Sequence, residues 1–223
     1  MKYKGVIFDF NGVLLWDGSW HNEVWADYSK KVRGSTFTDD EYENVVNGRG
    51  NRDILSYLLG RDVTQDELRE HGEAKESAYQ NVALSKKDAF TLSPGAVELL
   101  NALRANNTAI TIGTSAPLYN VRFYFQHLHL DKWFEIEKVS CDDGTVRGKP
   151  APDIYVRAAQ KIGVAPEECI VIDDAETGVQ AAVAAHIGKI IGLGTKERHV
   201  SLIAAGAHKT TMSLEDMTLE ELE

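Results

Sequence analysis

The sequence has few of the residues that mark several protein classes. Its 223 residues include only two cysteines, Cys141 and Cys169, which excludes a disulfide framework and a Cys/His zinc cluster. No run of about 18 apolar residues occurs, which excludes a membrane-spanning helix. Lys and Arg number 24 against 34 Asp and Glu, and the net charge of −10 disfavours binding to nucleic acid or anionic membranes.

The remaining composition is ordinary. Hydrophobic residues make up 43% of the chain and charged residues 26%, as in many globular proteins. Two isolated cysteines fit a reducing cytoplasm. Because the chain enters an apolar strand almost at once, we expect no signal peptide. We therefore expect a cytoplasmic monomer that acts on a small molecule.

The stretch from Tyr3 to Asp17 organises the rest of the chain. Its apolar run 6–8 is typical of a short buried strand, and polar residues begin abruptly at Asp9. Gly12 allows the backbone to turn. Open α/β sheets bind ligands at the carboxyl ends of their strands, which makes Asp9 a candidate nucleophile. The alternative is that Asp9 only caps the following turn.

Residues 16–89 have a helical pattern without strand signals. Apolar residues recur there at helical spacing, as in Trp20, Val24, Trp25 and Tyr28. Thr64 with Glu67 three residues later resembles a capping box. Lys75 and Glu76 are adjacent and do not share a helix face, so we expect both to be solvated. The sequence predicts an all-helical domain, 16–89, inserted after the first strand.

Strands and helices alternate in the rest of the chain. The predicted strands are 108–114, 134–140, 168–172 and 189–193. The predicted helices are one opened by Ser93-Pro94, then 119–128, 152–162, 178–187 and an acidic helix capped by Ser213. This alternation implies an α/β core with a doubly wound parallel sheet, Rossmann-like, formed by residues 1–15 and 90–223.

Polar residues follow four of the predicted strands. They are Asp9, Thr114, Lys149 and the pair Asp173-Asp174, and in a parallel sheet they lie along one edge. Carboxylates gathered there repel one another unless a cation such as Mg²⁺ lies among them. Thr114 offers a hydroxyl, and Lys149 a charge, to a phosphoryl group that a carboxylate attacks. An Asp-Asp pair alone is commonly a solvated turn, so the inference depends on the shared edge.

Four motifs carry a resemblance to a known family. IFDFNGVLL, ITIGTSA, GKPAPDIY and VIDDAETGVQAA occur in this order along the chain. The chain thereby resembles the haloacid dehalogenase (HAD) superfamily, in particular its β-phosphoglucomutase-like group with a helical cap. The resemblance implies the following roles: Asp9 as nucleophile, Thr114 with Ser115 at the phosphate, Lys149 as the stabilising lysine, and Asp9, the Asn11 carbonyl, Asp173 and Asp174 as Mg²⁺ ligands.

Asn11 departs from the family pattern, which has a second Asp there as general acid and base. An amide neither gives nor takes a proton at neutral pH, although its backbone carbonyl can still ligate the metal. Three explanations stay open. Another group such as His21 supplies the proton, the residue is an engineered block on turnover, or the protein binds phosphate esters without turning them over.

The substrate contacts also depart from those of the mutase. Ala116-Pro117-Leu118 lacks the side-chain donors with which the mutase grips its sugar phosphate. In the cap, His21 matches the family histidine near the hinge, or is a capping or surface histidine. Arg49 lies in a Gly-rich turn, where it can reach a substrate phosphate, or is a solvated helix end.

These residues together predict a function. We expect a Mg²⁺-dependent phosphatase that acts on a small phosphorylated metabolite through an aspartyl-phosphate, with slow hydrolysis of that intermediate because of Asn11. A β-phosphoglucomutase-like sugar phosphomutase and a catalytically silent phosphate-ligand binder are the alternatives.

Overall fold

The computed structural model of the protein describes residues 3–220. The chain divides into two compact units. One, called here the core unit, runs up to Trp16 and resumes at Thr91. The other, the helical unit, is Asp17–Phe90.

A six-stranded parallel sheet forms the centre of the core unit, in the order β3-β2-β1-β4-β5-β6. Its strands are β1 (Gly5–Phe8), β2 (Ala109–Pro117), β3 (Ser140–Asp142), β4 (Cys169–Asp173), β5 (Lys189–Leu193) and β6 (Lys209–Thr211). Every residue of β1 and β4 is buried, as expected for strands covered on both faces. The predicted doubly wound α/β core is confirmed.

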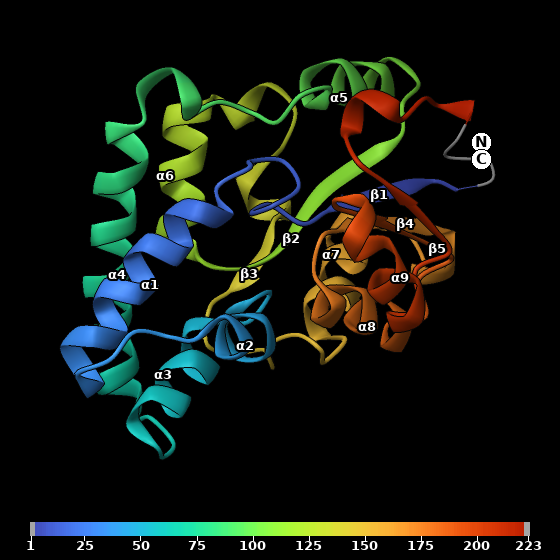
Figure 1. Cartoon of the computed structure of the whole chain (residues 1–223). Helices are drawn as coiled ribbons and strands as arrows, with labels where there is room; N and C mark the ends of the chain where they lie inside the picture. Colours follow the sequence, from blue (N-terminus) through green and yellow to red (C-terminus); the bar gives the residue numbers. More distant parts are fainter. Residues whose placement is uncertain (1–2, 221–223) are drawn as a thin grey trace. The chain divides into compact units, whose positions relative to one another are not determined.

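Five helices cover this sheet. They are α5 (Ala96–Ala105), α6 (Leu118–Leu128), α7 (Asp153–Ile162), α8 (Glu176–Ala184) and α9 (Lys196–Ala205). Helices α7, α8 and α9 lie together on one face (Figure 1), where Tyr155, Val171 and Leu202 share a hydrophobic core. Right-handed crossovers place α5 and α6 on the other face. The strand order reverses around β1, the position where such sheets bind ligands.

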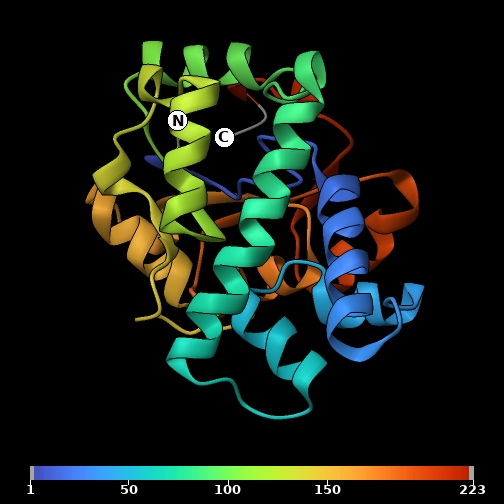
Figure 2. The same ribbon diagram turned by 90° about the vertical axis from the view of Figure 1, so that its left-hand side faces the viewer.

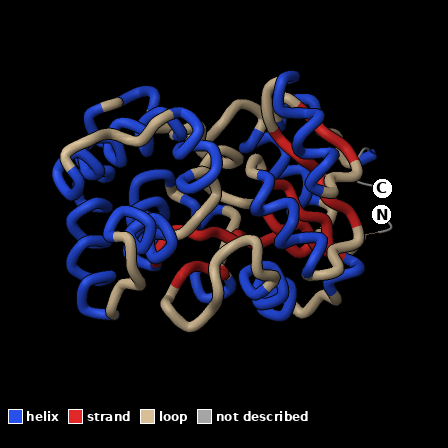
Figure 3. The backbone as a smooth tube through the Cα atoms, turned by 60° about the horizontal axis from the view of Figure 1, so that its bottom comes forward, coloured by secondary structure: helices blue, strands red, loops and turns tan. Residues whose placement is uncertain are grey.

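The helical unit contains no strand between residues 17 and 90 (Figure 3). Its elements are α1 (Gly18–Arg33), α2 (Asp39–Glu41), a π-helical turn η1 (Tyr42–Val46), α3 (Asn51–Leu59), α4 (Gln65–Ser85) and a 3₁₀ turn η2 (Lys87–Ala89). Helices α1 and α4 run side by side (Figure 2). The predicted capping box at Thr64 is present, with the Glu67 carboxylate accepting from the Thr64 backbone.

Within residues 3–220, no helix combines the length and apolar character needed to cross a membrane. Even α4, with 21 residues, carries seven charged residues between Asp66 and Glu76.

The predicted strand 134–140 was wrong. Residues 136–138 form a 3₁₀ turn, and the strand β3 is confined to Ser140–Asp142. In this segment, side chains donate hydrogen bonds to the backbone carbonyls of Lys138 and Val139, as a neighbouring strand would do in a sheet. The Thr111 hydroxyl donates to the Lys138 carbonyl over 2.7 Å, and Lys161 Nζ donates to the Val139 carbonyl over 2.9 Å.

The end of the core unit also differs from the prediction. The expected acidic helix is only a 3₁₀ turn η6 (Leu214–Asp216), although Ser213 caps it by accepting from the Glu215 backbone over 3.1 Å. Residues 217–220 of that predicted helix are not α-helical, and residues 221–223 lie outside the described residues. Helix α9 and strand β6 had no predicted counterpart, because α9 leaves Val200 and Ile203 exposed and shows weak helical periodicity.

Candidate active site

Asp9 follows β1 directly, at the carboxyl edge of the sheet. Its backbone N–H donates to the Ile172 carbonyl over 2.9 Å, which continues the pairing of β1 with β4 through this residue. Its side chain is 10% exposed, and Oδ1 lies 3.0 Å from Lys149 Nζ. The strand therefore fixes a largely buried carboxylate beside a cation.

Lys149 connects two strands of the site. Its Nζ lies 2.8 Å from Asp173 Oδ2 as well as 3.0 Å from Asp9 Oδ1, and the residue is 1% exposed. Burial alone would lower the pKa of this ammonium, but Asp173 and Asp9 outweigh burial and raise it. Lys149 is therefore a permanent cation between the two carboxylates.

Asp173 ends β4 and is fully buried. Its Oδ1 accepts from the Ala175 backbone over 2.9 Å, and its Oδ2 accepts from the Tyr155 hydroxyl. Gly178 on α8 packs against this carboxylate so closely that a Cβ would overlap it. Sequence reasoning missed Tyr155, whose only signal was its place in the GKPAPDIY motif.

Asp174 lies against the turn that follows Asp9. Gly12 has a φ of +84°, and a Cβ there would overlap the Asp174 carboxylate. Glycine is thus required both by the left-handed backbone and by the close approach. Arg198 Nη1 lies 4.0 Å from Asp174 Oδ2.

The three carboxylates form one acidic group. Asp9, Asp173 and Asp174 each offer an oxygen atom, and these atoms lie within 4.8 Å of one another. Burial raises the pKa of Asp9 to about 7, against the opposing effect of Lys149. Burial, with Asp173 and Asp9, raises the pKa of Asp174 well above its usual value. These carboxylates are hard to ionise together unless a positive charge lies among them. Their oxygen atoms are the kind of ligand that Mg²⁺ prefers, so the group fits a divalent cation such as Mg²⁺.

Thr114 and Ser115 lie near the end of β2, the other neighbour of β1. Thr114 is 1% exposed, and its Oγ1 accepts from the Ala116 backbone over 3.1 Å. A hydroxyl that accepts in this way keeps its own proton to donate. These residues thus stand at the same edge as Asp9 and offer polar groups there.

Asn11 is held by the core unit. Its Nδ2 donates to the Tyr124 hydroxyl over 3.0 Å, and Tyr124 is 1% exposed on α6. The ring of Phe10 stacks on Tyr124 with centroids 4.2 Å apart. The short turn closes where Gly12 N–H donates to the Leu15 carbonyl over 2.7 Å. Sequence reasoning missed Tyr124, since α6 carries no polar motif at this position.

His21 belongs to the helical unit and has its own partners there. Its Nδ1 lies 3.1 Å from Lys75 Nζ, and its Nε2 lies 3.3 Å from Asp17 Oδ2. Its ring stacks on Tyr79 with centroids 4.1 Å apart, and the Tyr79 hydroxyl donates to Asp17. His21 is therefore part of a polar network and not a free surface residue.

The expectation that Lys75 and Glu76 are solvated was wrong. They are 1% and 2% exposed, and Lys75 Nζ lies 2.9 Å from Glu76 Oε1. Burial would raise the pKa of Glu76, but Lys75 and His21 outweigh it and lower that pKa. Asn51 Nδ2 donates to the same carboxylate over 2.9 Å. Because α4 packs against both α1 and α3, adjacent residues of α4 can both be covered.

Arg49 also belongs to the helical unit. It is half-buried, and its Nε has no hydrogen-bond partner among residues 3–220. With Arg52, Asp53 and Ser56 it lines a cavity of about 570 Å³. Arg52 Nη1 donates to the Val63 carbonyl over 3.2 Å, which ties the other arginine of this cavity to the backbone.

Comparisons with known proteins agree on the family. Residues 3–186 match the profile described as haloacid dehalogenase-like hydrolase. The chain is 27% identical to a phosphorylated carbohydrates phosphatase of Thermotoga maritima, over 85% of both chains. It is 29% identical to a β-phosphoglucomutase of Bacillus subtilis, over 98% of this chain and 93% of that protein. A crystal structure of a HAD hydrolase of family IA, variant 3, from Entamoeba histolytica is 34% identical, with a TM-score of 0.86 over 98% and 97% of the two chains.

Proposed function

The chain belongs to the haloacid dehalogenase-like hydrolase family, and from this premise we propose a Mg²⁺-dependent phosphatase that works through a phosphoryl group on Asp9. Its substrate is a small phosphorylated metabolite. The observation that carries the proposal is Lys149 Nζ, buried between Asp9 and Asp173 at the carboxyl edge of the sheet. Relatives named as phosphatases and a phosphoglucomutase make phosphorylated carbohydrates the first substrates to screen.

The chain's own residues supply a route to phosphoryl transfer. An oxygen of the Asp9 carboxylate attacks phosphorus, and the ester oxygen leaves with the bonding electrons. Lys149 stabilises the ionised form of Asp9 and the charge that spreads over the phosphoryl oxygens. The hydroxyl of Thr114 and the adjacent Ser115 bind those oxygens. Asp173 and Tyr155 hold Lys149 in place.

The acidic group is the proposed cation site. Asp9, Asp173, Asp174 and the backbone carbonyl of Asn11 would hold Mg²⁺, which neutralises negative charge on the phosphoryl oxygens when bound. Without a cation, Asp9 and Asp174 resist ionisation, because burial raises the pKa of Asp9 to about 7 and that of Asp174 well above its usual value. Binding of a metal ion to these residues should therefore release protons from Asp9 and Asp174.

Mg²⁺ affinity is expected to rise with pH. Below about pH 7 a proton on Asp9 competes with the ion, so the apparent dissociation constant should rise by about tenfold for each pH unit lowered, for one proton displaced. Titration calorimetry at about pH 5.5 and about pH 8 measures this difference. Asp143→Asn is a matched control, because Asp143 lies on a loop and pairs with Arg157 of α7, not with the acidic group. Equal affinity at both pH values contradicts the prediction.

The helical unit supplies the proposed substrate contacts. Arg49 lines a cavity and its buried Nε has no hydrogen-bond partner among residues 3–220, and His21 is held by Lys75 and Asp17. Both side chains suit the polar part of a phosphorylated metabolite. A sugar phosphomutase is less well supported, because Ala116-Pro117-Leu118 has no side-chain donor for a second phosphate.

A reducing cytoplasm is the proposed location. Cys141 and Cys169 are both buried free thiols, and burial raises the pKa of each. Such thiols behave as small apolar side chains and are protected from oxidation.

Detection of the phosphoenzyme tests the proposed function. The full chain is incubated with Mg²⁺ and p-nitrophenyl phosphate or acetyl phosphate, quenched rapidly, and analysed by peptide mass spectrometry. One phosphoryl group is expected, on the peptide that contains Asp9, and Asp9→Asn should carry none. A chain that binds phosphate esters yet is never phosphorylated would be a binding protein, and a phosphoryl group on another residue would exclude the proposed nucleophile.

A further inference from the structure

The proton-bearing groups around Asp9 are directed at carboxylates. Lys149 Nζ lies between Asp9 Oδ1 and Asp173 Oδ2, and the Tyr155 hydroxyl donates to Asp173. Both groups are therefore committed to the anionic side of the site. Neither is free to give a proton to the oxygen that leaves phosphorus.

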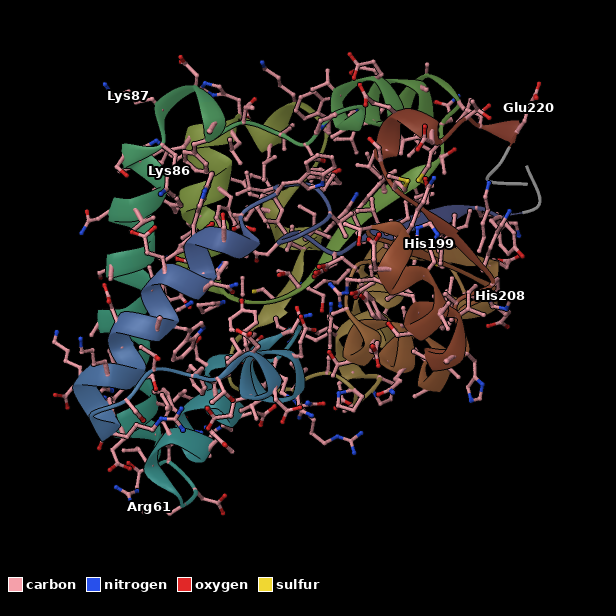
Figure 4. The ribbon with its side chains drawn as sticks, in the orientation of Figure 1. Arg61, Lys86, Lys87, His199, His208 and Glu220 are labelled. Carbon is pink, nitrogen blue, oxygen red and sulfur yellow. The ribbon has the colours of Figure 1, made fainter. Side chains whose placement is uncertain are left out.

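The side chain two residues beyond Asp9 has no acidic proton. Asn11 is an amide, and its Nδ2 is engaged with the hydroxyl of the buried Tyr124 over 3.0 Å. His199 on α9, labelled in Figure 4, follows Arg198, whose Nη1 lies 4.0 Å from Asp174 Oδ2. The Nε2 of His199 donates to the Gly194 carbonyl over 3.0 Å. Asn11, Lys149 and Tyr155, three of the side chains described around Asp9, therefore offer no proton to a leaving group.

From this arrangement we infer a substrate class, in an argument that rests on the proposed phosphatase function. The enzyme selects phosphoryl compounds whose leaving oxygen departs as a stable oxyanion, namely aryl and acyl phosphates, over phosphates of ordinary alcohols. The Asp9 carboxylate forms the new P–O bond, the bond from phosphorus to the leaving oxygen breaks, and that oxygen keeps the electron pair. It takes a proton later from water, so that no proton from the core unit is required.

The residues that follow Thr114, at the end of β2 and the start of α6, fit such a leaving group. Ala116, Pro117 and Leu118 follow it at the same edge of the sheet and offer no side-chain hydrogen-bond donor. Leu118 and Tyr119 each leave 37% of their surface exposed, so apolar surface is accessible beside residues 116 and 117. An aromatic or other apolar leaving group gains contact there, whereas a charged second phosphate has no side-chain donor at residues 116–118.

The test is a leaving-group series measured as kcat/KM, which reports the phosphorylation step. We would compare p-nitrophenyl, phenyl and acetyl phosphate with ethyl phosphate and glucose 6-phosphate, for the full chain and for Asn11→Asp. The full chain should prefer p-nitrophenyl to ethyl phosphate strongly. Asn11→Asp supplies an acid and should shrink that ratio by about 10²–10⁴-fold, the usual contribution of general acid catalysis. A high rate with acetyl phosphate alone would identify acyl phosphates as the substrate class. A high rate with the aryl esters alone would identify aryl phosphates.

Two results overturn the inference. The first is the same ratio of p-nitrophenyl to ethyl phosphate in both proteins. The second is a small ratio in the full chain that becomes large in His21→Ala, which would make His21 the acid. In both cases Asp9 is still phosphorylated, so the proposed function stands. Failure of the function itself is different, because then no member of the series phosphorylates Asp9.

Discussion

Replacement of Lys149 by methionine is expected to lower the rate of Asp9 phosphorylation by at least about 10²–10³-fold, the loss that follows removal of one preorganised electrostatic donor. Methionine keeps most of the buried stem and removes only the charge. Lys149 is the nearest cation to Asp9, at 3.0 Å, and it opposes the burial that already raises the pKa of that carboxyl to about 7. Without Lys149 this pKa rises further, and the nucleophile is protonated at neutral pH. Quenched-flow phosphorylation by p-nitrophenyl phosphate measures the loss.

The same substitution should destabilise the fold in a pH-dependent way. Removing one partner of a buried ion pair typically costs about 3–5 kcal/mol, because the remaining charge is left uncompensated. A carboxyl whose folded pKa is raised favours the folded state only while it is protonated. The loss of the Asp173 partner contributes a deficit that is already present at about pH 5. The contribution of Asp9 should be added as the pH rises through about 7, where Asp9 ionises in the unsubstituted chain, so the total deficit should grow with pH.

Urea denaturation of both proteins at the two pH values measures this deficit. Lys138→Met is a matched control, since Lys138 lies 2.8 Å from Glu135 on the surface, where an ion pair contributes little. A deficit for Lys149→Met that is no larger than that of the control, or that shrinks as the pH rises, contradicts the electrostatic argument.

The fold could be predicted where local chemistry and burial agree. Strands β1 and β4 are runs without charge, and the Thr64 capping box lies within four residues of sequence. The strand at 134–140 failed because its carbonyls are satisfied by Thr111 and Lys161, which are distant in sequence. A pattern of neighbouring residues does not contain such long-range hydrogen bonds.

The site shows the same division between local and long-range information. Asp9 and Asp173 could be placed at one edge of the sheet because β1 and β4 were predicted, and Lys149 lies beside both although the strand predicted before it was wrong. The partners that hold these groups could not be foreseen. Tyr155 donates to Asp173, and Tyr124 accepts from Asn11, through contacts fixed only by the packing of α7 and α6 on the sheet. Buried polar partners of this kind are a property of the folded molecule.

Asn11→Asp is expected to raise kcat for p-nitrophenyl phosphate by about 10²–10⁴-fold. With this substrate the leaving group needs no acid, so kcat is limited by attack of water on the phosphoryl group of Asp9. A carboxylate at position 11 can take the proton from that water, which an amide cannot. The site should tolerate the change, because the two side chains are nearly equal in size and the Tyr124 hydroxyl that now accepts from Asn11 can donate to a carboxylate.

The rate of the nitrophenolate burst shows which step changes. A faster hydrolysis of phospho-Asp9 leaves the burst rate unchanged, whereas a faster phosphorylation of Asp9 raises it. In the native chain we expect a rapid burst of nitrophenolate followed by slow turnover, and in Asn11→Asp a similar burst followed by fast turnover. Asn11→Ala is the control, because it removes the amide without adding a base, and its kcat should not rise. If the native chain already turns over as fast as Asn11→Asp, a proton route independent of position 11 operates. His21, held beside Lys75 in the helical unit, is then the next residue to replace, since it is the proposed substrate contact that carries an imidazole, a common general acid and base in enzymes.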